Sequence, residues 1–172
     1  MKTFRHILVP TDGSAASELS ARAAIALAAA QKAKVTALHV MPDFSSHGAA
    51  ETADELGRDF IRAAERASQM RAEAYLARIE AMAERAHVPF KARLVRAAPA
   101  YLAIVEEARR NHCDLIAMGS HGRDDGSGLL GSVTARVAIH GAVPVLVNPA
   151  ASGATASGSR RRGSARGRAA GA

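Results

Sequence analysis

Cysteine is almost absent from this sequence, and neither a long apolar run nor a secretory signal is present. The one cysteine among 172 residues, Cys113, cannot form an intrachain disulfide, and its place in an apolar run predicts a buried, unreactive thiol. No apolar run is long enough to span a bilayer, and residues 1–10 have neither the apolar core nor the cleavage site of a signal peptide. We therefore expect a soluble cytoplasmic protein with no membrane partner.

Most of the formal net charge of +7 comes from the carboxyl end of the chain, where acidic residues are absent. Residues 151–172 contain five arginines, whereas the rest of the chain has 18 basic and 16 acidic side chains. Glycine, serine and alanine dominate this tail, so residues 150–172 are predicted to be disordered. The tail has no aromatic side chain for base stacking, so we expect at most weak nucleic-acid contacts through its arginines. The seven histidines show no zinc-binding spacing.

Short apolar runs alternate with helical periodicities over residues 1–149, which is typical of βαβ units and a mainly parallel sheet. The expected strands are 6–10, 34–41, 88–96, 114–118 and 144–148; the expected helices are 15–31, about 59–86, 99–111 and 132–140, with 42–58 as a mobile crossover. The pattern predicts one α/β domain with an open doubly wound sheet and helices on both faces. Ligands bind such sheets beyond the carboxyl ends of the strands, where the strand order reverses.

Apolar residues at three- or four-residue spacing predict the buried faces of two helices. In the helix before the third strand they are Tyr75, Ile79, Met82 and Ala86; in the helix after it they are Leu102, Val105 and Ala108. Pro99 is expected at the first position of the latter helix, where a proline is tolerated.

The first loop that can support chemistry follows the first strand. It has the sequence Pro10-Thr11-Asp12-Gly13-Ser14. The carboxylate of Asp12 can reach a metal ion or a ribose hydroxyl, and Gly13 permits a sharp turn. Asp and Ser before a helix are also ordinary capping residues. This loop alone therefore leaves both interpretations open.

A second loop, within residues 119–134, joins the fourth strand to the last helix and is rich in glycine. Small residues let backbone N–H groups approach phosphate oxygens, and the following helix adds the positive end of its dipole. Ser132 and Thr134 place hydroxyls at that helix start. A flexible surface loop is the alternative, but the place of this loop at the expected ligand edge favours phosphate binding. Neither a P-loop nor a G-x-G-x-x-G after the first strand is present.

Four segments resemble the universal stress protein family, in particular its ATP-binding branch. They are HILVPTDGS (6–14), ALHVM (37–41), DLIAMGSHGR (114–123) and GSVTARVAIHGAVPVLV (131–147). The branch has the pattern G-x-x-G, nine residues, then G-[ST]. Gly119, Gly122 and Gly131-Ser132 match it, but eight residues lie between rather than nine. Outer loop positions tolerate changes of length, so we expect binding to persist with altered affinity.

The resemblance implies a site for ATP and Mg²⁺, with Asp12 as the metal-binding residue. It places Pro10, Thr11 and Asp12 beside the adenosine and the metal, Val40 against adenine, and Met118 and Gly119 beside the ribose. Around the phosphates it places Gly122, Gly131, Ser132, Val133 and Thr134.

The resemblance also implies the strand order 3-2-1-4-5 and a homodimer. The dimer would form through the last strand, Val143–Asn148, whose exposed edge offers unpaired backbone groups to a partner.

Three functions follow from these patterns. The leading hypothesis is an ATP-binding stress-response or signalling module that needs no catalytic group. A slow ATP hydrolase is an alternative, in which His121 or Asp124 would orient a water molecule, although neither has a partner that identifies it as a base. The other alternative is a dimeric interaction module of the same fold that does not bind nucleotide.

Overall fold

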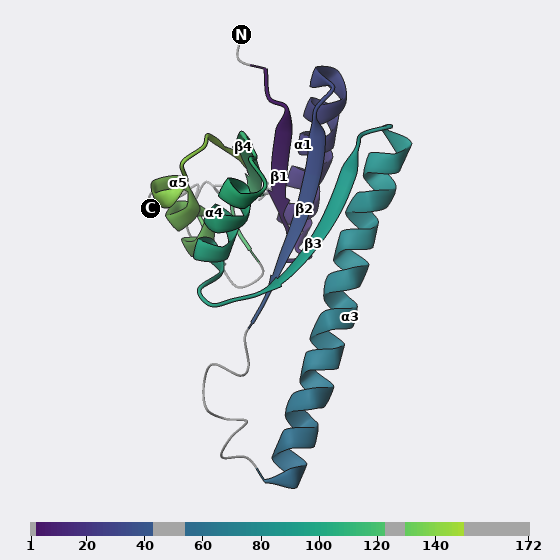
Figure 1. Cartoon of the computed structure of the whole chain (residues 1–172), viewed down its shortest axis with the longest axis vertical. Helices are drawn as coiled ribbons and strands as arrows, with labels where there is room; N and C mark the ends of the chain where they lie inside the picture. The colour runs from purple at the N-terminus through teal and green to yellow at the C-terminus, as the bar shows by residue number, and fades with distance from the viewer. Residues whose placement is uncertain (1–2, 43–53, 123–129, 150–172) are drawn as a thin grey trace, which may run out of the picture.

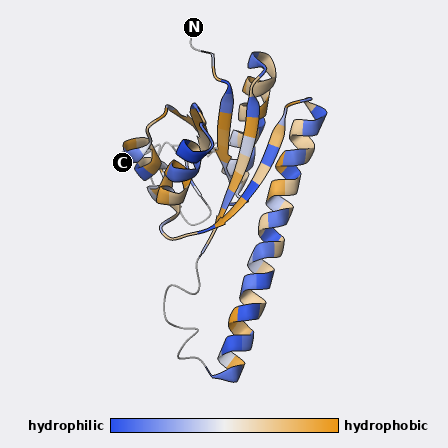
Figure 2. Cartoon of the chain, in the orientation of Figure 1, coloured by the Kyte–Doolittle hydropathy of each residue, from blue (hydrophilic) through white to orange (hydrophobic). Residues whose placement is uncertain are grey.

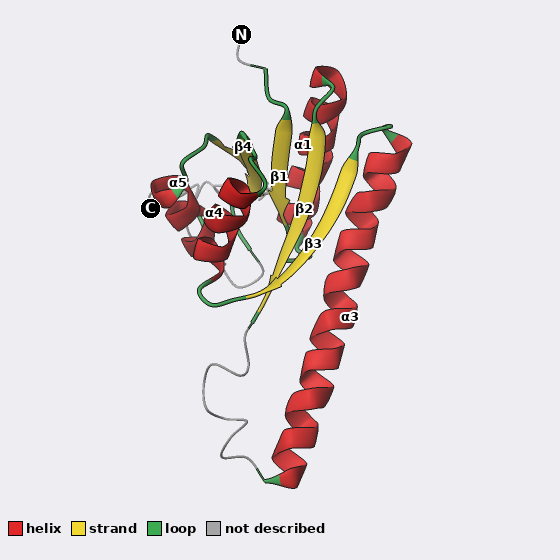
Figure 3. Cartoon of the chain, in the orientation of Figure 1, coloured by secondary structure: helices red, strands yellow, loops and turns green. Residues whose placement is uncertain are grey.

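The computed structural model describes residues 3–42, 54–122 and 130–149, which form a parallel five-stranded sheet with helices on both faces (Figure 3). In chain order the elements are β1 (His6–Pro10), α1 (Ala15–Gln31), β2 (Lys34–Met41), α3 (Glu55–Arg85), β3 (Phe90–Arg96), α4 (Ala100–Arg110), β4 (Leu115–Gly119), α5 (Ser132–His140) and β5 (Val145–Asn148). The predicted α/β class and strand order β3-β2-β1-β4-β5 are confirmed. The predicted disordered tail and most of the predicted crossover lie outside the described residues.

The strand order reverses at β1, which is hydrogen-bonded to β2 on one side and to β4 on the other. The register pairs Ile7 with Val35 of β2 and with Leu115 of β4. The chain leaves β1 toward one edge of the sheet and later returns to fill the other edge (Figure 1). A crevice is expected between the carboxyl ends of β1 and β4 in such a sheet.

Two apolar cores lie on opposite faces of the sheet, because successive side chains of a strand point to opposite faces. Ile7 and Val9 pack with α1 and α3, whereas Leu8 packs with residues of α4 and α5. Every residue of β1 is buried, as its continuous apolar sequence predicts for a central parallel strand. None of the helices in the described residues is long and apolar enough to cross a membrane.

Helix α3 begins earlier than predicted. Asp54 caps it by accepting a 2.8 Å hydrogen bond from the Gly57 N–H, so the last residues of the expected crossover are already helical. The residues that face the core are Ala72, Leu76, Ile79 and Ala83. Of the predicted inward residues, Ile79 is buried and Tyr75, Met82 and Ala86 are half-buried. The true buried face is therefore centred slightly to one side of the predicted one.

The prediction for the inward face of α4 was right for Ala108, which is buried, and wrong for Leu102, which is 51% exposed; Val105 is half-buried. The other buried residues of α4 are Ala103, Ile104 and Glu107. A carboxylate occupies one of the inward positions, so the spacing of apolar residues pointed to the wrong side. Pro99 is the N-cap, with extended backbone angles, and not the first helical residue.

Three strands begin one or two residues later than expected. Strand β3 begins at Phe90 because the N–H of Val88 instead donates to the Ala83 carbonyl at 2.9 Å and so completes the end of α3. Strand β4 is shifted by one residue, to Leu115–Gly119. Strand β5 begins only after Pro144, which has no backbone N–H to donate.

Candidate functional site

A cavity of about 140 Å³ opens at the carboxyl ends of the central strands. Residues from β1, β2, β4 and α5 line it. Nine of the predicted site residues are among them: Pro10, Thr11, Asp12, Val40, Met118, Gly119, Gly122, Val133 and Thr134. Gly131 and Ser132 do not line the cavity but form the N-cap and first residue of α5, directly before Val133. Two loops that are far apart in the sequence therefore meet at one site.

The walls of the cavity are of two kinds. Leu38 and Val40 of β2 and Met118 of β4 are apolar and lie on either side of β1, while Ile104 comes from α4. The polar side chains that line the cavity include Thr11, Asp12, Ser17, His121 and Thr134. Such a surface suits a ligand with an apolar ring at one end and polar or charged groups at the other.

The turn after β1 fixes the carboxylate of Asp12 at the start of α1. Its Oδ1 accepts a hydrogen bond from the Ser14 N–H at 3.0 Å. One residue earlier, Thr11 Oγ1 accepts from the Gly13 N–H at 3.2 Å and lies 3.1 Å from Ser17 Oγ. These bonds hold Asp12 beside the cavity and leave little freedom for the turn.

Two glycines let the end of β4 and the loop after it approach this turn closely. A Cβ atom at Gly119 would lie 2.9 Å from the carbonyl carbon and oxygen of Ala16 in α1. A Cβ atom at Gly122 would lie 2.9 Å from Asp12 Oδ2. Both distances are shorter than ordinary van der Waals contacts, so a side chain at either position requires a shift of its neighbours.

The start of α5 is fixed against the end of β4. The Gly131 N–H donates to the Ser120 carbonyl at 2.6 Å, and the buried hydroxyl of Thr134 donates to the Gly119 carbonyl at 3.0 Å. Gly131 is the N-cap, so no side chain caps this helix. Backbone N–H groups at an α-helix start carry partial positive charge, and here that start lies at the cavity.

The same turn is also supported from the other face of the sheet. Gly13 has a φ of +77°, and a Cβ atom there would lie 2.3 Å from the ring of Tyr75 in α3. The Tyr75 ring lies 5.7 Å from the ring of His39, whose Nδ1 is 2.7 Å from the Thr11 carbonyl oxygen. Helix α3 therefore packs directly on the turn that supplies Thr11 and Asp12.

A metal ion at this site would have few protein ligands. The described residues contain no group of three His, Cys, Asp or Glu side chains placed to hold a metal. Asp12 is the carboxylate among the lining residues. Mg²⁺ is commonly bound by one or two carboxylates together with substrate phosphates and water. The residues therefore fit a magnesium ion that arrives with a phosphate ligand.

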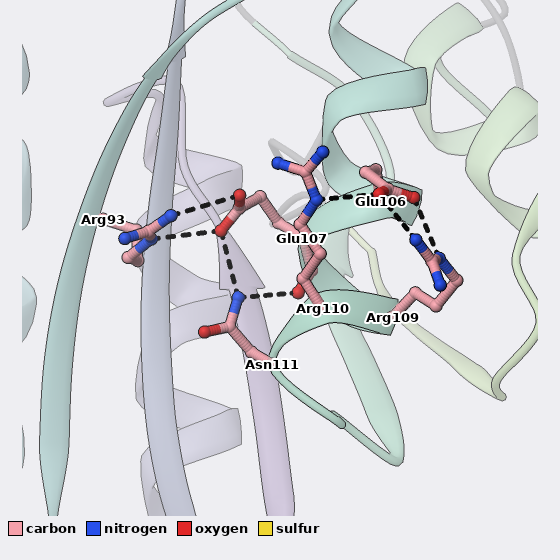
Figure 4. Close-up of polar contacts among 6 residues, drawn as sticks. All are labelled: Arg93, Glu106, Glu107, Arg109, Arg110 and Asn111. Carbon is pink, nitrogen blue, oxygen red and sulfur yellow. Dashed lines mark hydrogen bonds and ion pairs between the residues drawn. The ribbon is translucent and has the colours of Figure 1, made fainter.

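Helix α4, which forms one wall of the cavity, is joined to β3 by an ion pair between the buried Glu107 and the partly exposed Arg93 (Figure 4). Arg93 donates to the two carboxylate oxygens of Glu107 at 3.1 and 3.2 Å, and Asn111 Nδ2 donates to Glu107 Oε2 at 3.0 Å. Burial alone would raise the pKa of Glu107, but these hydrogen bonds and the Arg93 charge hold it below its ordinary value. Glu107 is therefore ionised and holds α4 against β3.

Sequence reasoning missed part of the cavity wall. Ser17, Leu38, Ala100 and Ile104 line it but were not predicted, and His121 was considered only for hydrolysis. Leu38 was accessible to prediction, because it lies two residues before Val40 and so shares its face of the strand. The α4 residues were not, because no local pattern tells which helix covers a strand end. Asp124, the other residue considered for hydrolysis, lies outside the described residues.

Comparison with known proteins gives one family. The family model of the universal stress protein family matches residues 3–149. A comparison with curated protein sequences found no match.

Solved structures of the same fold were found as well. A universal stress protein in complex with cAMP is 26% identical, with 87% of this chain and 99% of that chain covered and a TM-score of 0.62. The UspA protein from Lactobacillus plantarum is 23% identical, with 86% and 99% covered and a TM-score of 0.68. A universal stress protein from Archaeoglobus fulgidus in complex with dAMP is 20% identical, with 85% and 98% covered and a TM-score of 0.60.

Proposed function

Because this chain belongs to the universal stress protein family, we propose that it binds ATP with Mg²⁺ and acts as a stress-response or signalling module. The observation that carries the proposal is the cavity at the point where the strand order reverses. There the carboxylate of Asp12, the backbone at Gly122 and the uncapped start of α5 meet beside apolar strand residues. Each part of ATP finds a chemically suitable partner in this arrangement.

The apolar half of the cavity suits the adenine ring. Leu38 and Val40 line it from β2, Met118 lines it from β4, and Ile104 lines it from α4. A purine between such side chains buries apolar surface at a gain of about 25 cal/mol per Å². The similar protein that was solved with cAMP has the same fold and also takes an adenine ring, which supports this assignment.

The polar half suits the ribose and the phosphates. We assign Thr11 and Gly119 to the ribose side and Gly122, Val133 and Thr134 to the phosphate side, with Gly131 and Ser132 acting through the backbone at the start of α5. Backbone N–H groups at a helix start bind anions without a basic side chain. Asp12 would hold the Mg²⁺ ion, which neutralises phosphate charge when it is bound.

We place the protein in the cytoplasm as a homodimer, with the arginine-rich tail making at most weak contacts with nucleic acid. Strand β5 is an edge of the sheet, and Leu146 on it is 38% exposed. An edge strand presents unpaired backbone groups that a second copy can pair with.

Slow ATP hydrolysis is the second candidate function. It rests on His121, which lines the cavity and whose Nδ1 lies 3.0 Å from Ser120 Oγ.

The test begins with freshly purified full-length protein. Nucleotide released by denaturation is identified by mass spectrometry, and the refolded or dialysed protein is titrated with Mg-ATP by calorimetry. The cavity variant is Ala100→Trp, because Ala100 lines the cavity from the first turn of α4. The matched control is Ala138→Trp, at an exposed position of α5 that does not line it.

We expect saturable binding by the wild type and the control, and a loss of at least about a hundredfold in affinity for Ala100→Trp, because an indole fills the space of the ring. Equal binding by both variants would show that ATP is held elsewhere. No binding by the wild type would contradict the proposal and favour the dimeric interaction module. Release of ADP at less than about one turnover per minute with ATP bound would identify slow hydrolysis as a side activity rather than as the function.

A further inference from the structure

Helix α3 has a second apolar stripe in addition to the one that packs on the sheet. Its members, which we call the α3 seam, are Leu56, Phe60, Ala63, Ala67, Met70, Ala74, Ala77 and Ala81. The three large side chains are among the most exposed apolar residues of the described chain: Leu56 is 79%, Phe60 75% and Met70 71% exposed. Single exposed apolar residues are ordinary, but a stripe along one helix is not.

The seam faces away from the sheet. The buried residues of α3 are Ala72, Leu76, Ile79 and Ala83, each two residues after a member of the seam. Two residues correspond to about 200° around a helix, so the two stripes lie on opposite sides. The amino-terminal half of α3 extends beyond the sheet (Figure 1), and apolar bands interrupt its otherwise hydrophilic surface (Figure 2).

The spacing of the seam is that of a coiled coil. Its members alternate between separations of four and three residues from Leu56 to Ala81, a repeat of 3.5 residues. The repeat persists for more than three heptads and about 38 Å of helix. A helix that only covers a sheet needs one apolar stripe with a period near 3.6. The second stripe is therefore explained by a second helix.

We propose that the α3 seam binds the α3 seam of a second copy of this chain as an antiparallel helix pair. In the register that overlaps the whole seam, Leu56 faces the partner's Ala81 and Phe60 faces the partner's Ala77. Ala67 faces the partner's Met70 in the same way. Every large side chain then meets an alanine, and alanine faces alanine only where Ala63 meets the partner's Ala74. A parallel pair would stack each large side chain on its own copy and leave alanine facing alanine at all five alanine positions.

The charges beside the seam favour the same arrangement. Arg66 and Glu73 precede seam members by one residue, so they flank the interface at its centre. In the antiparallel register each Arg66 lies beside the partner's Glu73, which gives two attractive pairs. A parallel pair would place Arg66 beside the partner's Arg71 instead. The antiparallel register brings Asp59 near the partner's Glu80 only at the two open ends, where salt screens the repulsion.

Disulfide trapping in the full-length chain tests this register directly. The double variant Ala63→Cys, Ala74→Cys should form two disulfides between copies, because these positions face each other in the antiparallel pair. They are eleven residues, or about 16 Å, apart along one helix, so they cannot bridge within a chain. The matched control is Arg58→Cys, Gln69→Cys, two exposed positions of α3 with the same separation outside the seam. The native Cys113 is buried and stays out of the reaction.

We expect mild oxidation to convert most of the seam variant, and little of the control, to a covalent dimer in which peptides containing positions 63 and 74 are linked. A dimer of Ala63→Cys alone linked through position 63 would overturn the antiparallel register. Trapping of the control as readily as the seam variant would overturn the interface. This readout is specific to α3, so it is independent of nucleotide binding and of pairing through β5.

Sedimentation provides the second measurement, without added cysteines. Phe60→Gln should raise the dissociation constant of the α3 pair by at least about tenfold, because each dimer loses two buried rings. Leu102→Gln is the control, since Leu102 is also a large exposed residue but lies on α4. Both substitutions are made in a Leu146→Lys background, in which pairing through β5 is disfavoured. If Phe60→Gln, like the control, leaves the sedimentation of this background unchanged, the proposal is wrong.

Discussion

The backbone of Gly122 lies against the carboxylate of Asp12, so closely that a Cβ atom at Gly122 would be 2.9 Å from Asp12 Oδ2. Three of the five strands, β2, β3 and β4, lie between the two residues in the sequence. Their contact joins the turn after β1 to the glycine-rich loop after β4. A methyl group added at Gly122 would therefore press directly on the carboxylate that we propose as the metal-binding group.

Gly122→Ala should weaken ATP binding by about tenfold or more, because the new methyl group displaces Asp12 or the loop. Stability should change little, since Gly122 is exposed. Calorimetric titration and thermal unfolding measure the two effects separately. Gly57→Ala in α3 is the control, where alanine is preferred in a helix and affinity should not change. Unchanged affinity in Gly122→Ala would show that this contact is not part of the site.

Asp12→Asn should remove most of the dependence of ATP binding on Mg²⁺. The amide oxygen can still accept the hydrogen bond from the Ser14 N–H, so the turn is retained while the charge is lost. Titrations with magnesium and with EDTA should differ by about tenfold or more in the wild type and by less than about threefold in the variant. A variant that keeps the full magnesium effect would exclude Asp12 as the metal-binding residue.

Glu107→Gln should destabilise the fold by about 2 kcal/mol at pH 7, because Glu107 is 3% exposed and its hydrogen bonds from Arg93 lose their ionic character. The folded pKa of Glu107 is lowered, so its contribution is present above the unfolded pKa of about 4.3 and is lost as pH falls through the folded pKa. The difference in the free energy of unfolding between wild type and variant should therefore become smaller below about pH 4.3.

Chemical denaturation at a series of pH values measures this gap. Glu106→Gln is the control at the neighbouring position. Glu106 pairs with Arg109 and Arg110 at the surface of α4, and hydrogen bonds from these arginines lower its pKa to about 2 (Figure 4). Surface ion pairs contribute little, so Glu106→Gln should change stability much less. An equal loss in both variants would contradict the buried-anchor role of Glu107.

Cys113 should not react with a thiol reagent in the native protein at pH 8. Burial raises the pKa of its thiol to about 12, with a smaller contribution from Asp114, so almost no thiolate is present. Reaction with a disulfide reagent should be at least about a thousandfold slower than in denaturant, as absorbance of the released thiolate measures. Rapid reaction in native buffer would show that the strand region around Cys113 opens readily.

Leu146→Lys should weaken self-association through β5. Leu146 lies on an edge strand and is 38% exposed, and a lysine at a sheet edge opposes pairing with another strand. Sedimentation velocity at several concentrations should show a smaller species than the wild type. Val133→Lys has a similarly exposed apolar residue on α5 rather than β5 and is the control. The same sedimentation in all three proteins would exclude β5 as an interface.

The sequence predicted the central strands and α5 because their patterns are local. The uninterrupted apolar residues of β1 and the capping hydroxyl before α1 each specify one structure. The inward face of α4 was not predictable in this way, because Glu107 is buried only through Arg93, fourteen residues away in β3. No local pattern pairs these two residues.

The residues of the candidate site were likewise predicted only where local patterns identify them. The two loops were predicted from their residue types, since glycine and a carboxylate after parallel strands suit phosphate and metal. Ala100 and Ile104 were missed because they line the cavity from across the sheet face. An alanine or isoleucine in a helix carries no sign of which ligand or strand end it will cover.

Tyr75 on α3 fills the space at Gly13, and through His39 it also contacts the backbone of Thr11. Helix α3, on one face of the sheet, therefore fixes the turn that lines the cavity on the other face. If two positions of α3 require two conformations of this turn, thermodynamic reciprocity applies to both sites. A partner that favours one position of α3 must then change nucleotide affinity by the same factor as the nucleotide changes the affinity for that partner.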